Sequence, residues 1–195
     1  MNSDKERIRK QFKKIRDLIS IAHRKKFSKK IIHSFLKLEK LQKAIDIGIY
    51  AHTQSEPETI SLIQTLNKIK KKVFLPKLNP KTKKMNFYAV QNLKDCKMGA
   101  FHILEPKESC PKAKKIDLMI VPGIAFDFEG YRLGYGKGFY DRFLKKNKNT
   151  YLVGFTFQKT LTKKLPKDPY DIPVHCVITE KNIIISSPTP ADIHN

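Results

Sequence analysis

The chain has 195 residues and a mass of 22.6 kDa, and its 40 Lys+Arg against 18 Asp+Glu give a formal net charge of +22. That length suits one domain, and a 40% hydrophobic fraction with 12 Phe and 7 Tyr excludes wholesale disorder. The longest apolar run, residues 118–126, is nine residues long and contains a Pro and a Gly. Because a membrane-spanning helix needs about 20 residues, no membrane association is expected.

The amino-terminal sequence lacks the apolar segment of a secretory signal, and the three cysteines are an odd number with no CxxC pair. These features predict reduced thiols in a cytoplasmic protein, without a disulfide framework or a zinc site. The positive charge is densest in residues 1–45, which carry a net charge of +11. A basic nucleic-acid-binding protein is therefore one hypothesis, and a Lys-rich surface that gathers smaller anions is another.

Helices are predicted first along the chain. Ile8, Phe12, Ile15 and Ile19 recur every three or four residues, so they mark one face of a helix. A second helix is expected over residues 27–38. Residues 55–58, Ser-Glu-Pro-Glu, predict a helix cap with Pro in the first turn of a helix that continues through residues 60–69.

Strands are expected over the hydrophobic runs that alternate with these helices: residues 45–50, 73–78, 86–90, 116–121, 151–157, 174–179 and 182–186. Pro76 predicts an edge or a strand end, and residues 91–115 an irregular connection. The nearly continuous apolar run at 116–121 predicts a central strand buried on both faces. The predicted fold is a single α/β domain over residues 1–187, with a largely parallel central sheet flanked by helices in a Rossmann-like three-layer arrangement, and a flexible tail over 188–195.

In such a sheet, ligands bind beyond the carboxyl ends of the strands, so the loop after residue 121 is the first candidate site. Four of the eight glycines lie within residues 130–138 of this loop: Gly130, Gly134, Gly136 and Gly138. Glycines let a backbone approach a phosphate closely, and Arg132 and Lys137 supply positive charge. The loop therefore predicts a polyphosphate cradle, although its spacing matches neither the Walker A nor the dinucleotide-binding pattern. A flexible surface turn with incidental charge is the alternative.

The stretch VPGIAFDFEGYRLGYGKGFYDRFL, residues 121–144, resembles the signature of the 5-formyltetrahydrofolate cyclo-ligase (methenyltetrahydrofolate synthetase) family. The resemblance continues in three weaker matches, namely the Lys5 and Arg9 pair, IYAHTQSEPET, and DIPVHCVITE at residues 171–180. In order, spacing and length it extends over nearly the whole chain.

The resemblance implies an ATP-dependent conversion of 5-formyltetrahydrofolate to 5,10-methenyltetrahydrofolate, with release of ADP and phosphate. In the family's route, the formyl oxygen is phosphorylated and N10 then attacks the formyl carbon. The resemblance also implies Mg²⁺ as cofactor, a monomer, and a folate substrate that can carry a polyglutamate tail, with no nucleic acid as partner. Another ATP-dependent ligase or kinase remains the alternative that keeps the phosphate site.

The family's functional residues are carried over as follows. Catalysis is assigned to Lys137 and Arg132. ATP binding is assigned to Lys5, Arg9, Arg132, Leu133, Gly134, Tyr135, Gly136, Lys137, Gly138, Phe139 and Tyr140. Folate binding is assigned to Arg9, Ala51, Glu56, Tyr135, Gly136, Lys137, Gly138 and Phe139, and Mg²⁺ binding to Asp141 and Asp171.

Several of these positions have a structural alternative. Lys5 and Arg9 also fit solvated cations on an amphipathic helix, and Phe139 also fits core packing. Glu56 also fits an acid at a helix amino terminus, and the sequence alone does not choose between Glu56 and Glu58. His175 stands where many family members carry an Asp, which leaves the role of that position open.

Overall fold

The computed structural model describes residues 2–53, 55–99 and 102–186, so the predicted tail over 188–195 lies outside the described residues. The helices are α1 (Asn2–Asp17), α2 (Ile21–Leu36), α3 (Glu39–Lys43), α4 (Ser61–Lys68) and α5 (Phe139–Leu144), with the 3-10 turns η1 (Leu93–Asp95) and η3 (Gln158–Thr160). The main sheet contains β1 (Asp46–Gly48), β2 (Lys72–Asn79), β3 (Lys84–Val90), β6 (Leu118–Val121), β9 (Tyr151–Phe155), β11 (Cys176–Ile178) and β12 (Ile183–Ile185). Two small sheets contain β7 (Ala125–Asp127), β8 (Arg132–Leu133) and β10 (Leu161–Thr162), and β4 (Cys96–Met98) with β5 (Leu104–Pro106).

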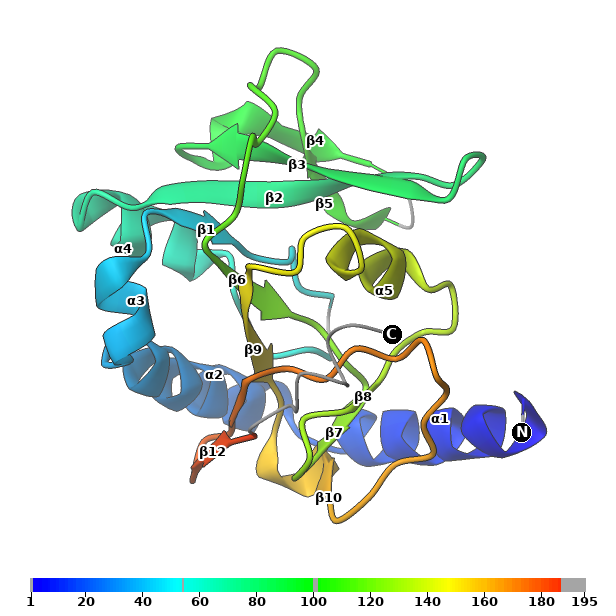
Figure 1. Ribbon diagram of the computed structural model, residues 1–195. Helices are drawn as coiled ribbons and strands as arrows, with labels where there is room; N and C mark the ends of the chain where they lie inside the picture. The colour runs from blue at the N-terminus through cyan, green and yellow to red at the C-terminus, as the bar shows by residue number, and fades with distance from the viewer. Residues whose placement is uncertain (1, 54, 100–101, 187–195) are drawn as a thin grey trace.

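The seven strands of the main sheet lie in the order β12-β11-β9-β6-β1-β2-β3 (Figure 1). The five inner strands are parallel to one another, and the outer strands β3 and β12 are antiparallel to β2 and β11. The predicted α/β class with a largely parallel sheet is therefore confirmed. From β1 the chain continues outward to β2 and β3, and from β6 it continues outward the other way. The carboxyl ends of β1 and β6 thus form the switch point of the sheet.

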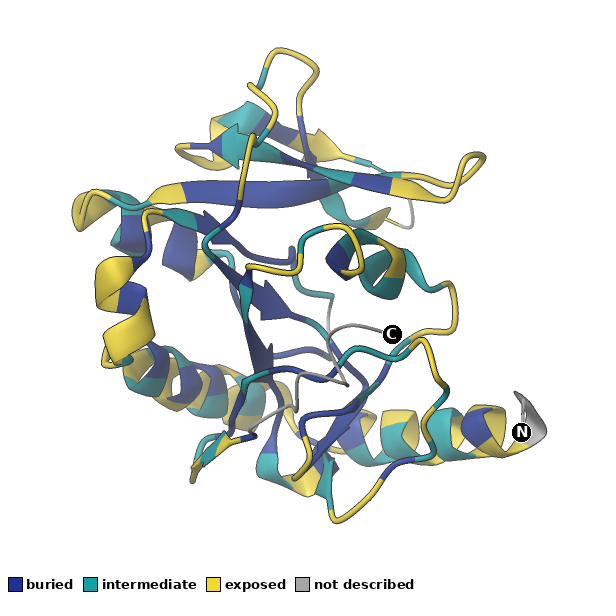
Figure 2. Ribbon diagram, in the orientation of Figure 1, coloured by how far each residue is buried: buried dark blue, intermediate teal, exposed yellow. Residues whose placement is uncertain are grey.

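Strand β6 shows why the sheet has helices on both faces. All four of its residues are buried, and side chains alternate between the faces of a strand. Leu118 and Ile120 join the core beneath α2, α3 and α4, whereas Met119 and Val121 join the core beneath α5. This burial along the centre of the molecule is visible in Figure 2 and confirms the predicted central strand.

Helix α1 packs on the small sheet that contains β7 and β8. Ile8 and Phe12, from the predicted apolar face, pack against Ala125, Leu133 and Leu165. This contact matters for function because it places the amino-terminal half of α1 beside residues 134–138, the part of the glycine loop that follows β8.

Three local expectations were wrong. Helix α4 begins at Ser61 without a side-chain cap, so residues 55–58 form a loop rather than a cap. Strand β2 is not at an edge; Pro76 is accommodated because β1 pairs with β2 only as far as Phe74. The connection over 91–115 contains the β4–β5 hairpin, whose three-residue strands are too short to show a periodic pattern. In the described part of the chain, no helix is both long and apolar enough to cross a membrane.

Candidate active site

A cavity of about 790 Å³ lies at the switch point, where the predicted glycine loop, the ends of β1 and β6, and α1 meet. Every residue carried over from the family resemblance lines it: Lys5, Arg9, Ala51, Glu56, Arg132, Leu133, Gly134, Tyr135, Gly136, Lys137, Gly138, Phe139, Tyr140, Asp141 and Asp171. The fold thus brings together segments from four parts of the sequence. The volume of the cavity is in the range that is typical of sites for organic ligands.

The glycine loop has the backbone conformation that glycine permits. Gly136 has φ +87° and Gly138 has φ +62°, both in the left-handed region that other residues rarely adopt. Gly138 is the residue before α5. Lys137, between these two glycines, is exposed and lines the cavity, and its carbonyl oxygen accepts a hydrogen bond of 2.8 Å from Nη2 of Arg142.

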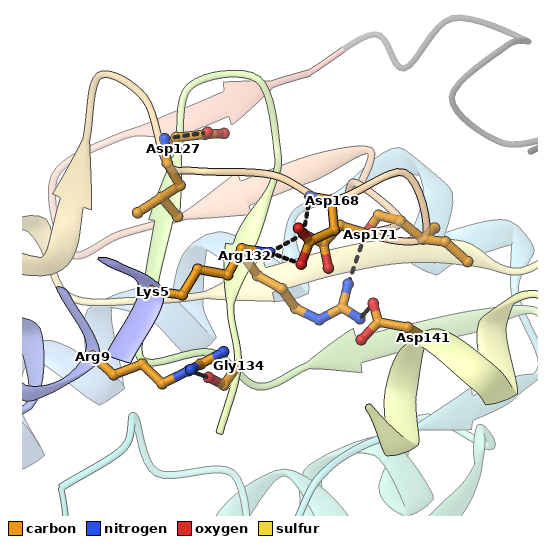
Figure 3. Close-up of polar contacts among 10 residues, drawn as sticks. Lys5, Arg9, Asp127, Arg132, Gly134, Asp141, Asp168 and Asp171 are labelled. Carbon is orange, nitrogen blue, oxygen red and sulfur yellow. Dashed lines mark hydrogen bonds and ion pairs between the residues drawn. The ribbon is translucent and has the colours of Figure 1, made fainter. Parts of the chain in front are cut away.

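Helix α1 brings two cations to the cavity (Figure 3). Nε of Arg9 donates a hydrogen bond of 2.9 Å to the carbonyl oxygen of Gly134, so the guanidinium is held against the loop. Lys5 is buried, and its Nζ lies 2.6 Å from a carboxylate oxygen of Asp168 and 2.6 Å from one of Asp171. Burial by itself lowers the pKa of Lys5, but the hydrogen bonds and charges of the two carboxylates outweigh it and leave that pKa raised. Lys5 is therefore a buried, ionised group rather than a solvated one.

Arg132 lines the cavity and has protein partners at both ends of its guanidinium. Its Nη1 donates a hydrogen bond of 2.7 Å to the carbonyl oxygen of Ile172, and its Nη2 pairs with Asp141. Both predicted Mg²⁺ ligands therefore have cationic partners, Asp141 through Arg132 and Asp171 through Lys5. Within the described ranges, no group of three or more His, Cys, Asp or Glu side chains is arranged to hold a metal ion.

Glu56 forms the acidic side of the cavity. It is 4% exposed; its Oε1 accepts a hydrogen bond of 2.9 Å from the hydroxyl of Tyr135, and its Oε2 accepts one of 2.8 Å from the backbone N–H of Thr53. Burial, and next the charge of Glu56, raise the pKa of Tyr135, so the phenol stays protonated. Glu58 does not line the cavity, and its backbone N–H donates to Oγ of Ser28. Of the two acids that the sequence left open, only Glu56 faces the cavity.

The aromatic residues after the loop serve both the cavity and the core. Phe139 and Tyr140 line the cavity and also pack on the cluster beneath α5. Burial raises the pKa of the Tyr140 phenol far above its usual value. The two interpretations of Phe139, as cavity wall and as core residue, are therefore compatible.

His175 lies away from the cavity. Its Nδ1 accepts a hydrogen bond of 3.0 Å from the backbone N–H of Leu152, and its ring stacks on Tyr151 with centroids 4.8 Å apart. Burial, and next the charge of Lys40, lower its pKa, so the ring is neutral near pH 7. Because His175 does not line the cavity, its departure from the Asp that many family members carry does not alter the cavity wall.

Four residues that sequence reasoning missed also support the site. Asp168 holds Lys5 with Asp171, and Asp127 accepts hydrogen bonds from the backbone N–H groups of Glu129, Tyr131 and Leu165, which shape the loop. Glu105 is a buried carboxylate of β5 that lines the cavity and accepts a hydrogen bond from the backbone N–H of Leu78. The fourth is Arg16, in α1 behind the cavity wall. Arg16 had a signal in the sequence, since it follows Arg9 by seven residues and so lies on the same helix face.

The fold and this cavity define an α/β ligand-binding protein whose site joins a basic glycine loop to an acidic, partly apolar wall. The sequence comparison then identifies its family. The profile of the 5-formyltetrahydrofolate cyclo-ligase family matches residues 1–180, and the chain belongs to that family.

Individual relatives agree with this assignment. The chain is 32% identical to 5-formyltetrahydrofolate cyclo-ligase of Haemophilus influenzae over 186 residues, covering 91% of this chain and 99% of the relative. It is similar to the solved structure of 5,10-methenyltetrahydrofolate synthetase from Aquifex aeolicus, with a TM-score of 0.84, 34% identity, and coverage of 93% and 92% of the two chains. A synthetase from Mycoplasma pneumoniae, at 21% identity and a TM-score of 0.71 over 91% of this chain and 99% of its own, shares the fold. The family resemblance read from the sequence is thus confirmed.

Proposed function

We propose that this protein converts 5-formyltetrahydrofolate and ATP to 5,10-methenyltetrahydrofolate, ADP and phosphate. Family membership supports the reaction. The observation that carries the site assignment is a single cavity lined on one side by Lys5, Arg9 and the glycine loop and on another by Glu56. The first side suits a polyphosphate and the second a heterocycle with N–H donors, so one cavity can hold both substrates in contact.

The ATP phosphates bind at the basic side. Arg9 and Arg132 are directed by backbone hydrogen bonds before any ligand arrives, so little conformational freedom is lost on binding. Lys137 lies between two glycines whose backbone leaves room for a phosphate. We assign Lys137 and Arg132 to stabilise the charge of the transferring phosphoryl group.

Mg²⁺ fits this site as a companion of ATP rather than as a resident ion. Asp141 and Asp171 are two carboxylates, and Mg²⁺ in phosphate-transfer sites takes one or two carboxylates and completes its coordination with phosphate and water oxygens. Bound there, it would neutralise phosphate charge. A chelator should abolish activity and added Mg²⁺ should restore it, with Asp141→Asn needing more Mg²⁺ than the wild type.

The folate binds along the wall that contains Glu56. A carboxylate such as Glu56 can accept hydrogen bonds from the 2-amino and ring N–H groups of the pterin. Tyr135 and Phe139 supply aromatic surface beside it, with Ala51 in the segment that follows β1. We expect the formyl group to point toward the glycine loop in this arrangement.

The chemistry then needs two steps. The γ-phosphoryl group passes from ATP to the formyl oxygen, which breaks its bond to the bridging oxygen and releases ADP. N10 attacks the formyl carbon and loses its proton, and the carbon–oxygen bond breaks as phosphate leaves with the electron pair. A formamide oxygen is a poor leaving group, so phosphorylation provides the driving force while the protein positions the reactants.

The direct test is the growth of methenyltetrahydrofolate absorbance when purified protein receives 5-formyltetrahydrofolate, ATP and Mg²⁺. Omission of ATP is the control. The proposal fails if the complete mixture shows no such signal. We also propose a cytoplasmic monomer that accepts polyglutamylated folate, to be checked by size-exclusion chromatography and by comparing KM values for mono- and polyglutamates.

The nucleic-acid hypothesis is not favoured by the family assignment, and neither is another ligase or kinase. The net charge of +22 still has a physical consequence, since a field of this sign attracts both anionic substrates. A salt titration with single-stranded RNA separates the hypotheses, because tight RNA binding at physiological salt without folate turnover would favour the nucleic-acid alternative.

A further inference from the structure

Arg16 is an arginine of α1 that the reaction as described does not use. It is 1% exposed, and it is not among the residues that line the cavity. A guanidinium cannot lose its charge in a protein, so a buried one requires hydrogen-bond acceptors in well-defined places. Its partners therefore show what this residue holds together.

The guanidinium of Arg16 contacts the three segments that surround the folate side of the cavity. Nε donates to Oγ of Ser55 at 3.1 Å, and Nη1 donates to the carbonyl oxygen of Gly123 at 3.2 Å. Nη2 donates to the hydroxyl of Tyr135 at 2.8 Å. Ser55 follows β1, Gly123 follows β6, and Tyr135 belongs to the glycine loop.

The contact with Tyr135 fixes the direction of the next hydrogen bond. Arg16 can only donate, so the phenol oxygen accepts from it and its single hydrogen is directed to Oε1 of Glu56, 2.9 Å away. The backbone N–H of Thr53 donates to the other oxygen of the same carboxylate. Both oxygens of Glu56 thus act as acceptors, so the two hydrogen bonds hold the carboxylate in one orientation.

We infer that Arg16 is a positioning residue for the folate: it acts through Tyr135 to hold the Glu56 carboxylate oriented toward the pterin's N–H donors. This inference rests on the proposed function, because it takes Glu56 as the folate ligand. Only the hydroxyl of Tyr135 lies between the Arg16 guanidinium and the Glu56 carboxylate. The positive charge of Arg16 therefore stabilises the carboxylate without a direct hydrogen bond to its oxygens. The lone pairs that face the cavity remain available to the ligand.

A purely structural role makes a different prediction. If Arg16 only tied three loops together, its loss would disturb the glycine loop as well, and the KM values for ATP and for 5-formyltetrahydrofolate would rise together. If it acts through Tyr135 on Glu56, the effect belongs to the folate alone. The two KM values measured in the same assay therefore separate the two roles.

The experiment compares Arg16→Met, Tyr135→Phe, the double variant and Glu56→Gln. Arg7→Met, an exposed arginine of the same helix, is the control for Arg16, and Glu58→Gln is the control for Glu56. We expect Arg16→Met to raise the KM for 5-formyltetrahydrofolate roughly 5- to 100-fold, the cost of leaving a buried polar group without its partner. The KM for ATP should change less than about two-fold, and the double variant should be no worse than the weaker-binding single variant, since both changes break one chain of hydrogen bonds.

The inference is overturned if Arg16→Met leaves the folate KM unchanged, if both KM values rise together, or if the effects of Arg16→Met and Tyr135→Phe multiply. If Glu56→Gln leaves the folate KM unchanged, the assignment of Glu56 in the proposed function fails, which is a separate result. Should Arg16→Met not fold, Ser55→Ala removes one anchor of the guanidinium and leaves its charge. A selective rise in folate KM then supports the inference, and an unchanged value opposes it.

Discussion

Replacing Gly136 by Ala tests whether the glycine loop needs backbone conformation rather than mere space. Gly136 has φ +87°, where an L-residue is strained, and an added Cβ would lie 3.4 Å from Cζ of Arg9. Gly134, two residues earlier in the same loop, is outside that region, and a Cβ there meets no described atom within 4 Å. Gly134→Ala is therefore a matched control.

The expected cost follows from the backbone. The left-handed conformation costs an alanine about 1–2 kcal/mol, and a loop that moves to avoid this cost also disturbs the hydrogen bond from Arg9 to Gly134. If the loss appears in phosphate binding, the KM for ATP in Gly136→Ala rises roughly 5- to 30-fold. The methenyl absorbance assay at varied ATP measures it, and thermal unfolding shows that the fold remains intact.

Gly134→Ala should stay within about two-fold of the wild-type KM for ATP, because neither φ nor a neighbouring atom opposes its methyl group. Equal losses in the two variants would refute the reasoning. They would mean that phosphate approaches both Cα atoms closely, so that space, and not conformation, is what both glycines supply.

Three further predictions concern catalysis, packing and pH. Lys137→Ala should reduce turnover by orders of magnitude with little change in thermal stability, because an exposed loop lysine contributes little to folding; a wild-type rate would mean that the phosphate site is misplaced. Gly154→Ala should lower stability by about 1–3 kcal/mol, because its Cβ would lie 2.4 Å from Cε1 of Phe126. Adding Phe126→Leu should recover part of that loss in urea unfolding, and no recovery would contradict the packing argument. His175 has a lowered folded pKa, so the unfolded state takes up its proton first as pH falls below about 6.5, and stability should decrease there. His175→Asn should weaken this acid dependence in unfolding curves measured at pH 5–8. The slope of the unfolding free energy against pH should change by less than about 1.4 kcal/mol per pH unit, because the ring is partly exposed. An unchanged dependence would exclude His175 as its source.

Much of the fold could be predicted from residues close together in the chain. The apolar run of 116–121 predicted β6, and the spacing of Ile8 and Phe12 predicted the packed face of α1. Such patterns can be recognised because a strand buried on both faces is a continuous apolar run, and an amphipathic helix repeats its apolar residues every three or four positions. The β4–β5 hairpin left no such period, since each of its strands has only three residues.

The glycine loop was also predictable, because a backbone at positive φ favours glycine at that position, as at Gly136 and Gly138. Its resemblance to a family signature then directed attention to Lys5, Arg9 and Glu56, which all line the same cavity. The sequence did not distinguish Glu56 from Glu58, since both occupy similar positions beside Pro57.

The sequence by itself determined the class of fold, the phosphate-type loop and the family. Only the tertiary structure decided which acid faces the cavity, that Lys5 is clamped by Asp168, and that Arg16 reaches Glu56 through Tyr135. The partners Glu56 and Tyr135 are 79 residues apart, and Lys5 and Asp168 are 163 apart. A local pattern reports which way a side chain leaves its own helix or strand, whereas the group it meets depends on how distant segments pack, and hydrogen bonds form only within about 3 Å.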